Sequence, residues 1–135
     1  MRLQNKIAIV TGAAFGMGES TARIFAREGA QVVVADIAEE DAKKVVAQIR
    51  ADGGDATFVR LDVSKEAEWA AAIRTTVERY GDRPAYSDKA DGRAEWRTFT
   101  WQRMYDAARD VAAGLVDAGV EPGRTVAIMA SNRIE

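Results

Sequence analysis

A glycine-rich stretch near the start of the chain has the composition of an anion-binding turn. Residues 11–18 read Thr-Gly-Ala-Ala-Phe-Gly-Met-Gly, and they lie between the apolar run 7–10 and a segment with helical spacing. Glycine suits such a turn because it adopts backbone angles that a Cβ would forbid and lets a diphosphate approach the main chain. The N–H groups in the first turn of the following helix then face the anion, at the positive end of the helix dipole. The stretch therefore predicts a phosphate-binding turn between a strand and a helix.

An acid at the end of the second strand indicates what the phosphates belong to. Residues 31–36 read Gln-Val-Val-Val-Ala-Asp and end in Asp36. A carboxylate that accepts hydrogen bonds from an adenosine ribose is expected roughly 20 residues after such glycines. The glycines alone would also fit a turn that only packs a strand against a helix. Together with Asp36 they favour a dinucleotide.

Asp36 also favours one dinucleotide over another. A carboxylate repels the additional phosphate of NADP, whereas the two ribose hydroxyls of NAD can donate to it, and such charge-assisted bonds contribute about 1.5–3 kcal/mol each. Neither Ile37 nor Ala38 supplies a positive charge that would offset the repulsion, and Ala13 and Ala14 in the turn are neutral. We therefore expect NAD to be preferred over NADP.

Composition excludes several classes of function. The chain of 135 residues carries 19 basic and 21 acidic residues, so we expect no nucleic-acid or membrane partner. It has no cysteine and no histidine, which removes the commonest metal ligands and the commonest general base, and no metal site is predicted. No signal peptide or bilayer-length apolar run is present, so a cytoplasmic protein is expected, and a homo-oligomer stays open.

The first part of the chain alternates between short β-branched runs and longer amphipathic segments. The expected strands are 6–11, 31–36 and 56–61, and the expected helices are 17–28, 39–51 and 65–80. This βαβαβα order predicts an α/β fold with a parallel, Rossmann-type sheet in the order 3-2-1. Gly29, Gly53 and Gly81 follow the helices, where left-handed residues are favoured. Apolar residues at helical spacing are expected to pack on the sheet: Ile24, Phe25, Val45, Val46, Ile49, Trp69, Ile73 and Val77.

These motifs together resemble the N-terminal half of the short-chain dehydrogenase/reductase family. The likeness runs from about residue 3 to 81 and depends on the glycine spacing, on Asp36 and on Leu-Asp-Val-Ser at 61–64. It implies that Gly12, Gly16 and Gly18 line the pyrophosphate turn, that Asp36 takes the ribose hydroxyls, and that Asp62 and Val63 flank the adenine. The candidate cofactor-binding residues are Gly12, Ala14, Phe15, Gly16, Met17, Gly18, Asp36, Ile37, Asp62 and Val63.

The catalytic residues that the resemblance would imply do not occur in this sequence. The family uses a Tyr and a Lys four residues apart on one helix, with a Ser nearby. The tyrosines are Tyr80, Tyr86 and Tyr105, and the residues four positions later are Pro84, Ala90 and Arg109. Tyr105 with Arg109, or Tyr86 with Lys89, could relay a proton, but an exposed amphipathic helix and a hairpin explain these pairs better. We therefore predict no catalytic residue.

The sequence changes character after Gly81. Arg-Pro-Ala at 83–85, a hairpin over 84–100, Thr-Phe-Thr-Trp at 98–101, a helix over 101–118 and a strand over 125–130 together resemble the start of the adenylate-forming enzymes. In that family this stretch precedes the ATP-contacting and catalytic motifs.

The sequence therefore divides into two segments, residues 1–81 and residues 82–135. We expect strand 125–130 to pair beside the first strand, the helix to cover one sheet face, and Asn-x-x-Glu at 132–135 to cap a helix.

Three functions remain open at this point. The first is an NAD-binding module of the short-chain dehydrogenase/reductase type that is not catalytic alone. The second is an oxidoreductase that becomes active when another chain supplies Ser, Tyr and Lys. The third is a truncated or engineered chimera in which nucleotide binding is vestigial.

Overall fold

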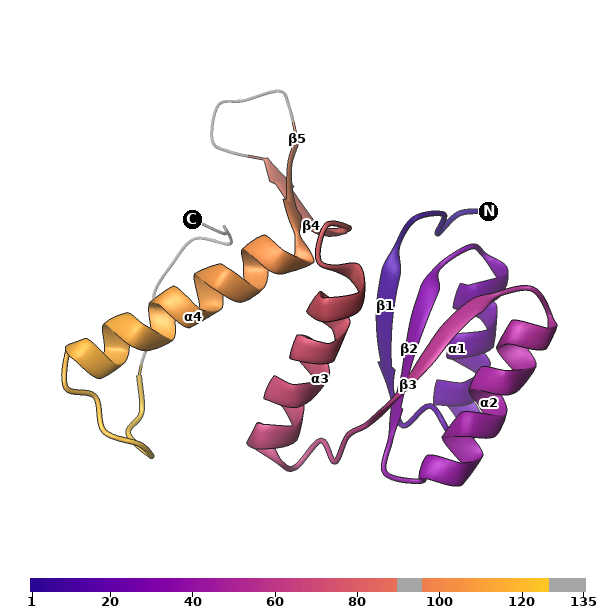
Figure 1. Ribbon diagram of the computed structural model, residues 1–135, viewed down its shortest axis with the longest axis horizontal. Coiled ribbons are helices and arrows are strands. Elements are labelled where there is room, and N and C mark those ends of the chain that lie inside the picture. Colours follow the sequence, from indigo (N-terminus) through magenta and orange to yellow (C-terminus); the bar gives the residue numbers. More distant parts are fainter. Residues whose placement is uncertain (90–95, 127–135) are drawn as a thin grey trace.

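A parallel sheet forms the centre of the N-terminal part. The structure is a computed structural model that describes residues 1–89 and 96–126 (Figure 1). Strands β1 (Ile7–Thr11), β2 (Gln31–Asp36) and β3 (Asp55–Arg60) lie in the order β1-β2-β3, with Gln31 opposite both Ile7 and Asp55. The predicted α/β fold and strand order are confirmed. Because the strands are parallel, their carboxyl ends meet at one edge, the lower edge in Figure 1.

Helices cover both faces of this sheet. Helices α1 (Gly16–Arg27) and α2 (Glu39–Ala51) pack on one face, and α3 (Glu66–Tyr80) packs on the other. Strand β2 lies between the two layers, and its three valines, Val32, Val33 and Val34, are fully buried. Such a continuous run of β-branched residues is typical of a parallel strand that is covered on both faces.

Two of the predicted core residues are exposed. Ile24 has an exposed fraction of 43% and Trp69 one of 37%, so neither packs into the sheet as expected. In α1 the neighbouring Phe25 contacts the core instead. In α3 the predicted Val77 is buried, and Ala72 and Tyr80 also contact the core. Helical spacing identified the correct helices, but it did not resolve which of two adjacent positions faces inward.

The glycines after the helices differ from one another. Gly29 and Gly53 have φ of 93° and 84°, which confirms the prediction of left-handed residues there. Gly81 has φ of −50° and stays right-handed, so the prediction for it was wrong. A Cβ on Gly81 would lie 2.8 Å from the carbonyl oxygen of Val77, so this glycine permits a close approach instead.

The C-terminal part begins with a two-stranded hairpin and a long helix. Strands β4 (Pro84–Lys89) and β5 (Trp96–Thr100) pair antiparallel, as predicted, and α4 (Trp101–Asp117) follows directly. Hydrogen bonds from the N–H of Trp101 to Arg83 O (3.1 Å) and from the N–H of Gln102 to Gly81 O (2.9 Å) fix the start of α4 against the end of α3.

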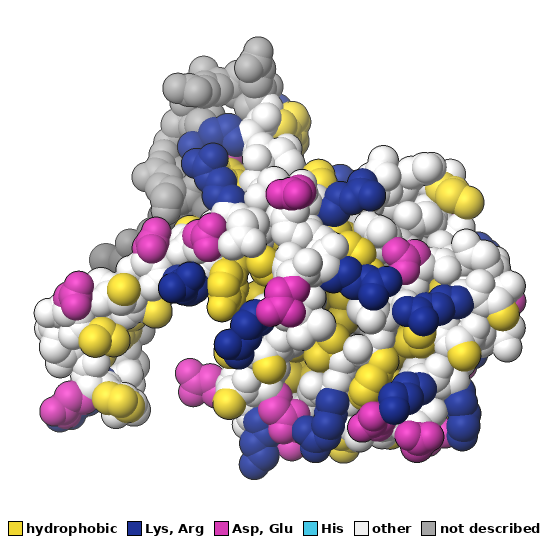
Figure 2. All heavy atoms as spheres, in the orientation of Figure 1, with side chains coloured by type: hydrophobic (Ala, Val, Ile, Leu, Met, Phe, Trp, Pro, Cys, Tyr) yellow, Lys and Arg dark blue, Asp and Glu magenta, His cyan; other side chains and the backbone are white. Residues whose placement is uncertain are grey.

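The position of α4 differs from the expected one. We expected this helix to cover a face of the parallel sheet, but it contacts α3, β4 and β5, and none of its residues is buried. Its far half stands away from the rest of the molecule (Figure 2). The reason is geometric, because α3 already occupies that side and the short connection holds only the first turn of α4. The predicted strand 125–130 lies mostly outside the described residues, and the predicted cap at 132–135 lies wholly outside them.

A prediction concerns the start of α4. The hydroxyl of Thr100 accepts a hydrogen bond from the N–H of Arg103 at 3.2 Å and so caps the helix. Replacing a Thr N-cap by Ala typically costs about 1 kcal/mol. We expect α4 of Thr100→Ala to unfold at a lower urea concentration than α4 of the unmodified chain, measured by circular dichroism at 222 nm. Thr75→Ala removes an exposed hydroxyl from α3 and serves as the control, with no loss of stability expected. Equal melting of the two variants would contradict the cap.

Candidate dinucleotide site

The glycine turn connects β1 to α1 at the carboxyl edge of the sheet. Gly12 and Gly16 have φ of 61° and 57°, a region in which other residues are strained. Between them Ala13 and Ala14 are buried, and the N–H of Ala13 donates to Ala35 O at 3.3 Å. The turn is therefore tied to the end of β2, and Gly12 and Gly16 adopt backbone angles that favour glycine, as expected.

Close backbone packing explains the third glycine. A Cβ on Gly18 would lie 2.6 Å from the carbonyl carbon of Gly12 and 3.0 Å from the Cα of Ala13. Only glycine lets α1 start this close to the turn. By contrast, a Cβ on Gly12 or on Gly16 would meet nothing within 4 Å, so these two positions border open space where a ligand could approach the main chain.

The first turn of α1 offers hydrogen-bond donors. The N–H of Glu19 makes the first helical bond, to Phe15 O at 3.2 Å, so the N–H groups of Gly16, Met17 and Gly18 have no acceptor in the helix. The N-cap residue Phe15 supplies no side-chain acceptor. These donors, together with the helix dipole, suit an anion such as a pyrophosphate.

Asp36 lies at the end of β2 and is only 8% exposed. Its Oδ2 accepts a hydrogen bond from the N–H of Ala14 and its Oδ1 one from the N–H of Ala38, both at 2.9 Å. The carboxylate therefore braces the glycine turn as well as facing the edge of the sheet. Each carboxylate oxygen has a second lone pair, so Asp36 can still accept from sugar hydroxyls.

Asp62 and Val63 follow β3 at the same edge. The Oδ1 of Asp62 accepts from the hydroxyl of Ser64 at 2.7 Å and from its N–H at 3.0 Å. These bonds, the hydroxyl first, lower the pKa of the Asp62 carboxyl and keep it charged. The structure thus gathers all three predicted segments, the turn, Asp36 and the Asp62–Val63 pair, at one edge of the sheet.

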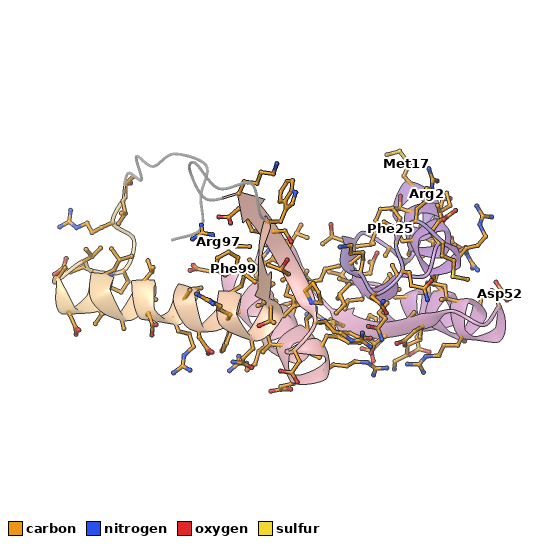
Figure 3. The ribbon with its side chains drawn as sticks, turned by 90° about the horizontal axis from the view of Figure 1, so that it is seen from above. Arg2, Met17, Phe25, Asp52, Arg97 and Phe99 are labelled. Carbon is orange, nitrogen blue, oxygen red and sulfur yellow. The ribbon has the colours of Figure 1, made fainter. Side chains whose placement is uncertain are left out.

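Apolar side chains of this edge are exposed. Phe15, Met17, Ile37 and Val63 follow three different strands, and their exposed fractions are 58%, 88%, 61% and 57%. Met17 points outward from α1 (Figure 3). Large exposed apolar residues that gather around polar donors are typical of a ligand site. A cleft of about 460 Å³ lies elsewhere, between the far ends of α1 and α2 beside Arg27 and Asp52, and does not touch this edge.

The two tyrosine pairs considered above lie in α4 and in strand β4. In α4 the guanidinium carbon of Arg109 lies 5.9 Å from the ring centre of Tyr105, on an exposed helix with Tyr105 half-buried. Tyr86 and Lys89 both belong to strand β4. The first pair thus lies on an exposed helix and the second in the hairpin.

Metal and membrane sites can be assessed for the described parts of the chain. Residues 1–89 and 96–126 contain no group of three or more acidic, His or Cys side chains that could hold a metal ion. Within the same ranges, no helix combines the length and apolar character that crossing a lipid bilayer requires.

Residues that sequence reasoning missed also belong to this edge. The N–H of Ala38 bonds Asp36, while Glu68 and Trp69 in the first turns of α3 bond the loop after β3. A backbone donor leaves no signal in a sequence. Glu68 was one of several acids in an amphipathic helix, and Trp69 looked like a core residue.

Two family models match overlapping segments of this chain. The family model for short chain dehydrogenase matches residues 6–83, and the model for AMP-binding enzyme matches 73–135, so the two overlap at 73–83. A 2,5-dichloro-2,5-cyclohexadiene-1,4-diol dehydrogenase of Sphingobium indicum is 52% identical over 89 residues, 66% of this chain and 36% of that protein. A mitochondrial borneol dehydrogenase of Lavandula x intermedia is 36% identical over 134 residues, 98% of this chain and 49% of that protein.

Solved structures agree with the sheet and its helices. A hydroxysteroid dehydrogenase from Escherichia coli aligns with a TM-score of 0.57 and 41% identity over 58% of this chain and 33% of its own. A 7α-hydroxysteroid dehydrogenase complexed with NADH aligns with a TM-score of 0.56 and 42% identity, covering 57% of this chain and 30% of its own. A metagenomic short-chain oxidoreductase in complex with NADP aligns with a TM-score of 0.58 and 32% identity, covering 60% of this chain and 37% of its own. The chain spans between a third and a half of the length of the curated relatives named above. Because the family model matches residues 6–83, which include the whole parallel sheet, the chain belongs to the short chain dehydrogenase family.

Proposed function

We propose that this chain is an NAD-binding module of the short chain dehydrogenase type. The observation that carries the proposal is the joint geometry of the glycine turn and Asp36, in which open space at Gly12 and Gly16 adjoins unpaired helix N–H groups and a nearly buried carboxylate. The turn would hold the pyrophosphate and Asp36 the adenosine ribose, while Asp62 and Val63 would flank the adenine.

The residues fit a nicotinamide dinucleotide, because a Cβ would occupy the space that the glycines leave beside the main chain. When bound, such a cofactor supplies hydride transfer. This chain's own residues would bind and orient it. No Tyr and Lys lie four residues apart within the 135 residues, so we propose that the chain binds without turning over a substrate alone.

NAD is the proposed partner in preference to NADP. The support is the charge at the proposed ribose end, where the Asp36 carboxylate would meet the sugar and Ile37 and Ala38 add no cation. An additional phosphate would have to approach a carboxylate that is braced by two N–H groups and cannot turn away.

We also propose that the segment after about residue 81 has a different origin, as the start of an adenylate-forming enzyme. The support is the match of the AMP-binding enzyme model to residues 73–135, and the hairpin and helix that replace a fourth parallel strand within the described residues. In this segment no ATP-contacting motif was identified, so nucleotide binding is assigned to the first part.

The test is a titration of the purified chain with NAD by thermal shift, repeated with Gly16→Val and Gly53→Val. Both glycines have positive φ and open space where a Cβ would lie, so both substitutions strain the backbone alike. Only Gly16 borders the turn. We expect NAD to stabilise the unmodified chain and Gly53→Val, and to leave Gly16→Val unaffected. An equal NAD response in both variants would refute the site.

A further inference from the structure

The loop that follows β3 is held by the helix that comes after it. The Oε2 of Glu68 accepts a hydrogen bond from the N–H of Asp62 at 2.7 Å and a second from Nη1 of Arg60, also at 2.7 Å. One residue further, the indole Nε1 of Trp69 donates to Val63 O at 3.0 Å. Two consecutive side chains of α3 therefore bind the two residues proposed to flank the adenine.

These contacts leave a specific pair of groups available. The two bonds from Ser64 end on Oδ1 of Asp62, and among the described residues no hydrogen bond ends on Oδ2 or starts from the N–H of Val63. The acceptor Oδ2 of Asp62 and the donor N–H of Val63 thus remain available in adjacent residues. Adenine offers the complement, because its amine donates and its ring nitrogens accept.

Glu68 is suited to fix this loop. Its carboxylate binds a main-chain donor and a guanidinium with the same oxygen, and the Asp62 N–H, followed by Arg60, lowers the pKa of Glu68. A charged acceptor makes stronger bonds than a neutral one. Trp69 adds a second anchor on the carbonyl side, although it is 37% exposed and contributes little to the core.

We propose that Glu68 and Trp69 are positioning residues that hold Asp62 and Val63 in the orientation that recognises adenine. This inference rests on the proposed function. It assigns the adenine selectivity of the site to two α3 residues that would not themselves touch the cofactor. Residues in the first turns of α3 would then orient the loop of the proposed binding site, while other residues of the helix pack in the core.

The experiment compares NAD with nicotinamide hypoxanthine dinucleotide by calorimetric titration of the full chain. Hypoxanthine carries a carbonyl and a ring N–H where adenine has its amine and a ring acceptor, so it reverses both polarities. We expect the unmodified chain to prefer NAD by about tenfold, the magnitude of one or two lost hydrogen bonds. A merely structural effect would weaken both ligands equally and leave this ratio unchanged.

Three Glu variants give the decisive comparison. Glu68→Ala is expected to weaken NAD about tenfold and bring the ratio close to one, because the loop loses the acceptor for the Asp62 N–H and Arg60 loses its ion pair. Glu68→Gln keeps an acceptor for Asp62 and should retain most of the preference. Glu66→Ala removes an exposed acid from the same turn and should behave as the unmodified chain. A ratio in Glu68→Ala equal to that in Glu66→Ala would overturn the proposal.

A second pair of variants covers the event that Glu68→Ala does not fold. Trp69→Phe removes the indole donor and keeps an aromatic ring, and we expect it to lower the NAD preference about threefold. Trp96→Phe in β5, 65% exposed, is its control. An unchanged preference in Trp69→Phe would count against the proposal. If the unmodified chain bound neither dinucleotide, the proposed function itself would fail, whereas binding with an unaltered ratio in the variants would sink only this inference.

Discussion

Replacing Gly18 by alanine is expected to weaken NAD binding and to destabilise the fold. The added Cβ would lie 2.6 Å from the carbonyl carbon of Gly12, a contact with main chain that no side-chain rotation can relieve. Overpacking of this kind costs about 1–3 kcal/mol in the free energy of unfolding. The turn must also shift, which moves the N–H groups that would face the pyrophosphate, so we expect NAD affinity to fall by more than about tenfold.

The measurement is urea unfolding together with titration of NAD. Gly114→Ala is the control, since Gly114 lies within α4 and a Cβ there would meet nothing within 4 Å. Removing a glycine from a helix interior should stabilise α4 by roughly 0.5–1 kcal/mol and leave binding unchanged. Full NAD affinity in Gly18→Ala would show that the turn is not the site.

Replacing Asp36 by alanine is expected to reduce NAD affinity by about 100-fold or more. Two charge-assisted hydrogen bonds to the ribose would be lost, each worth about 1.5–3 kcal/mol. The N–H groups of Ala14 and Ala38 would also lose their acceptor. Because Ala14 is buried, we expect the free energy of unfolding to fall by about 1–3 kcal/mol as well.

Calorimetric titration with NAD and NADP, together with urea unfolding, separates these effects. Asp36→Arg should weaken NAD and relax the discrimination against NADP, since it replaces repulsion of the added phosphate by attraction. Asp82→Ala removes an exposed acid between α3 and the hairpin and should change neither property. Equal binding of NAD and NADP by the unmodified chain would contradict the assigned preference.

Much of the N-terminal fold could be predicted because its signals are local. Valine-rich runs such as 31–36 mark covered strands, and parallel order follows from the helices between them. The exceptions depend on tertiary contacts. Gly81 is needed for a close approach to a carbonyl one turn earlier rather than for a left-handed conformation, and α4 does not cover the sheet because its first turn is fixed to α3. Neither contact is visible in a linear pattern.

The residue types of the candidate site follow from the sequence, but its hydrogen bonds do not. The glycine spacing and Asp36 identified the edge of the sheet, since those positions need glycine or an acid for direct reasons of space and charge. The roles of Glu68 and Trp69 were not apparent, because each makes a bond to main chain across a loop. Such bonds depend on how a loop closes, and acids or aromatics are common on helices for other reasons.

The brace that Asp36 forms would restrict how the proposed cofactor choice can evolve in this chain. Its carboxylate holds the N–H groups of Ala14 and Ala38, so a mutation that alters sugar selectivity also removes a support of the neighbouring turn. A descendant that adopts the phosphorylated cofactor would need a compensating change first, to supply another acceptor for those amides. The proposed selectivity and the stability of the turn would therefore depend on the same residue, and a single substitution at Asp36 would change both.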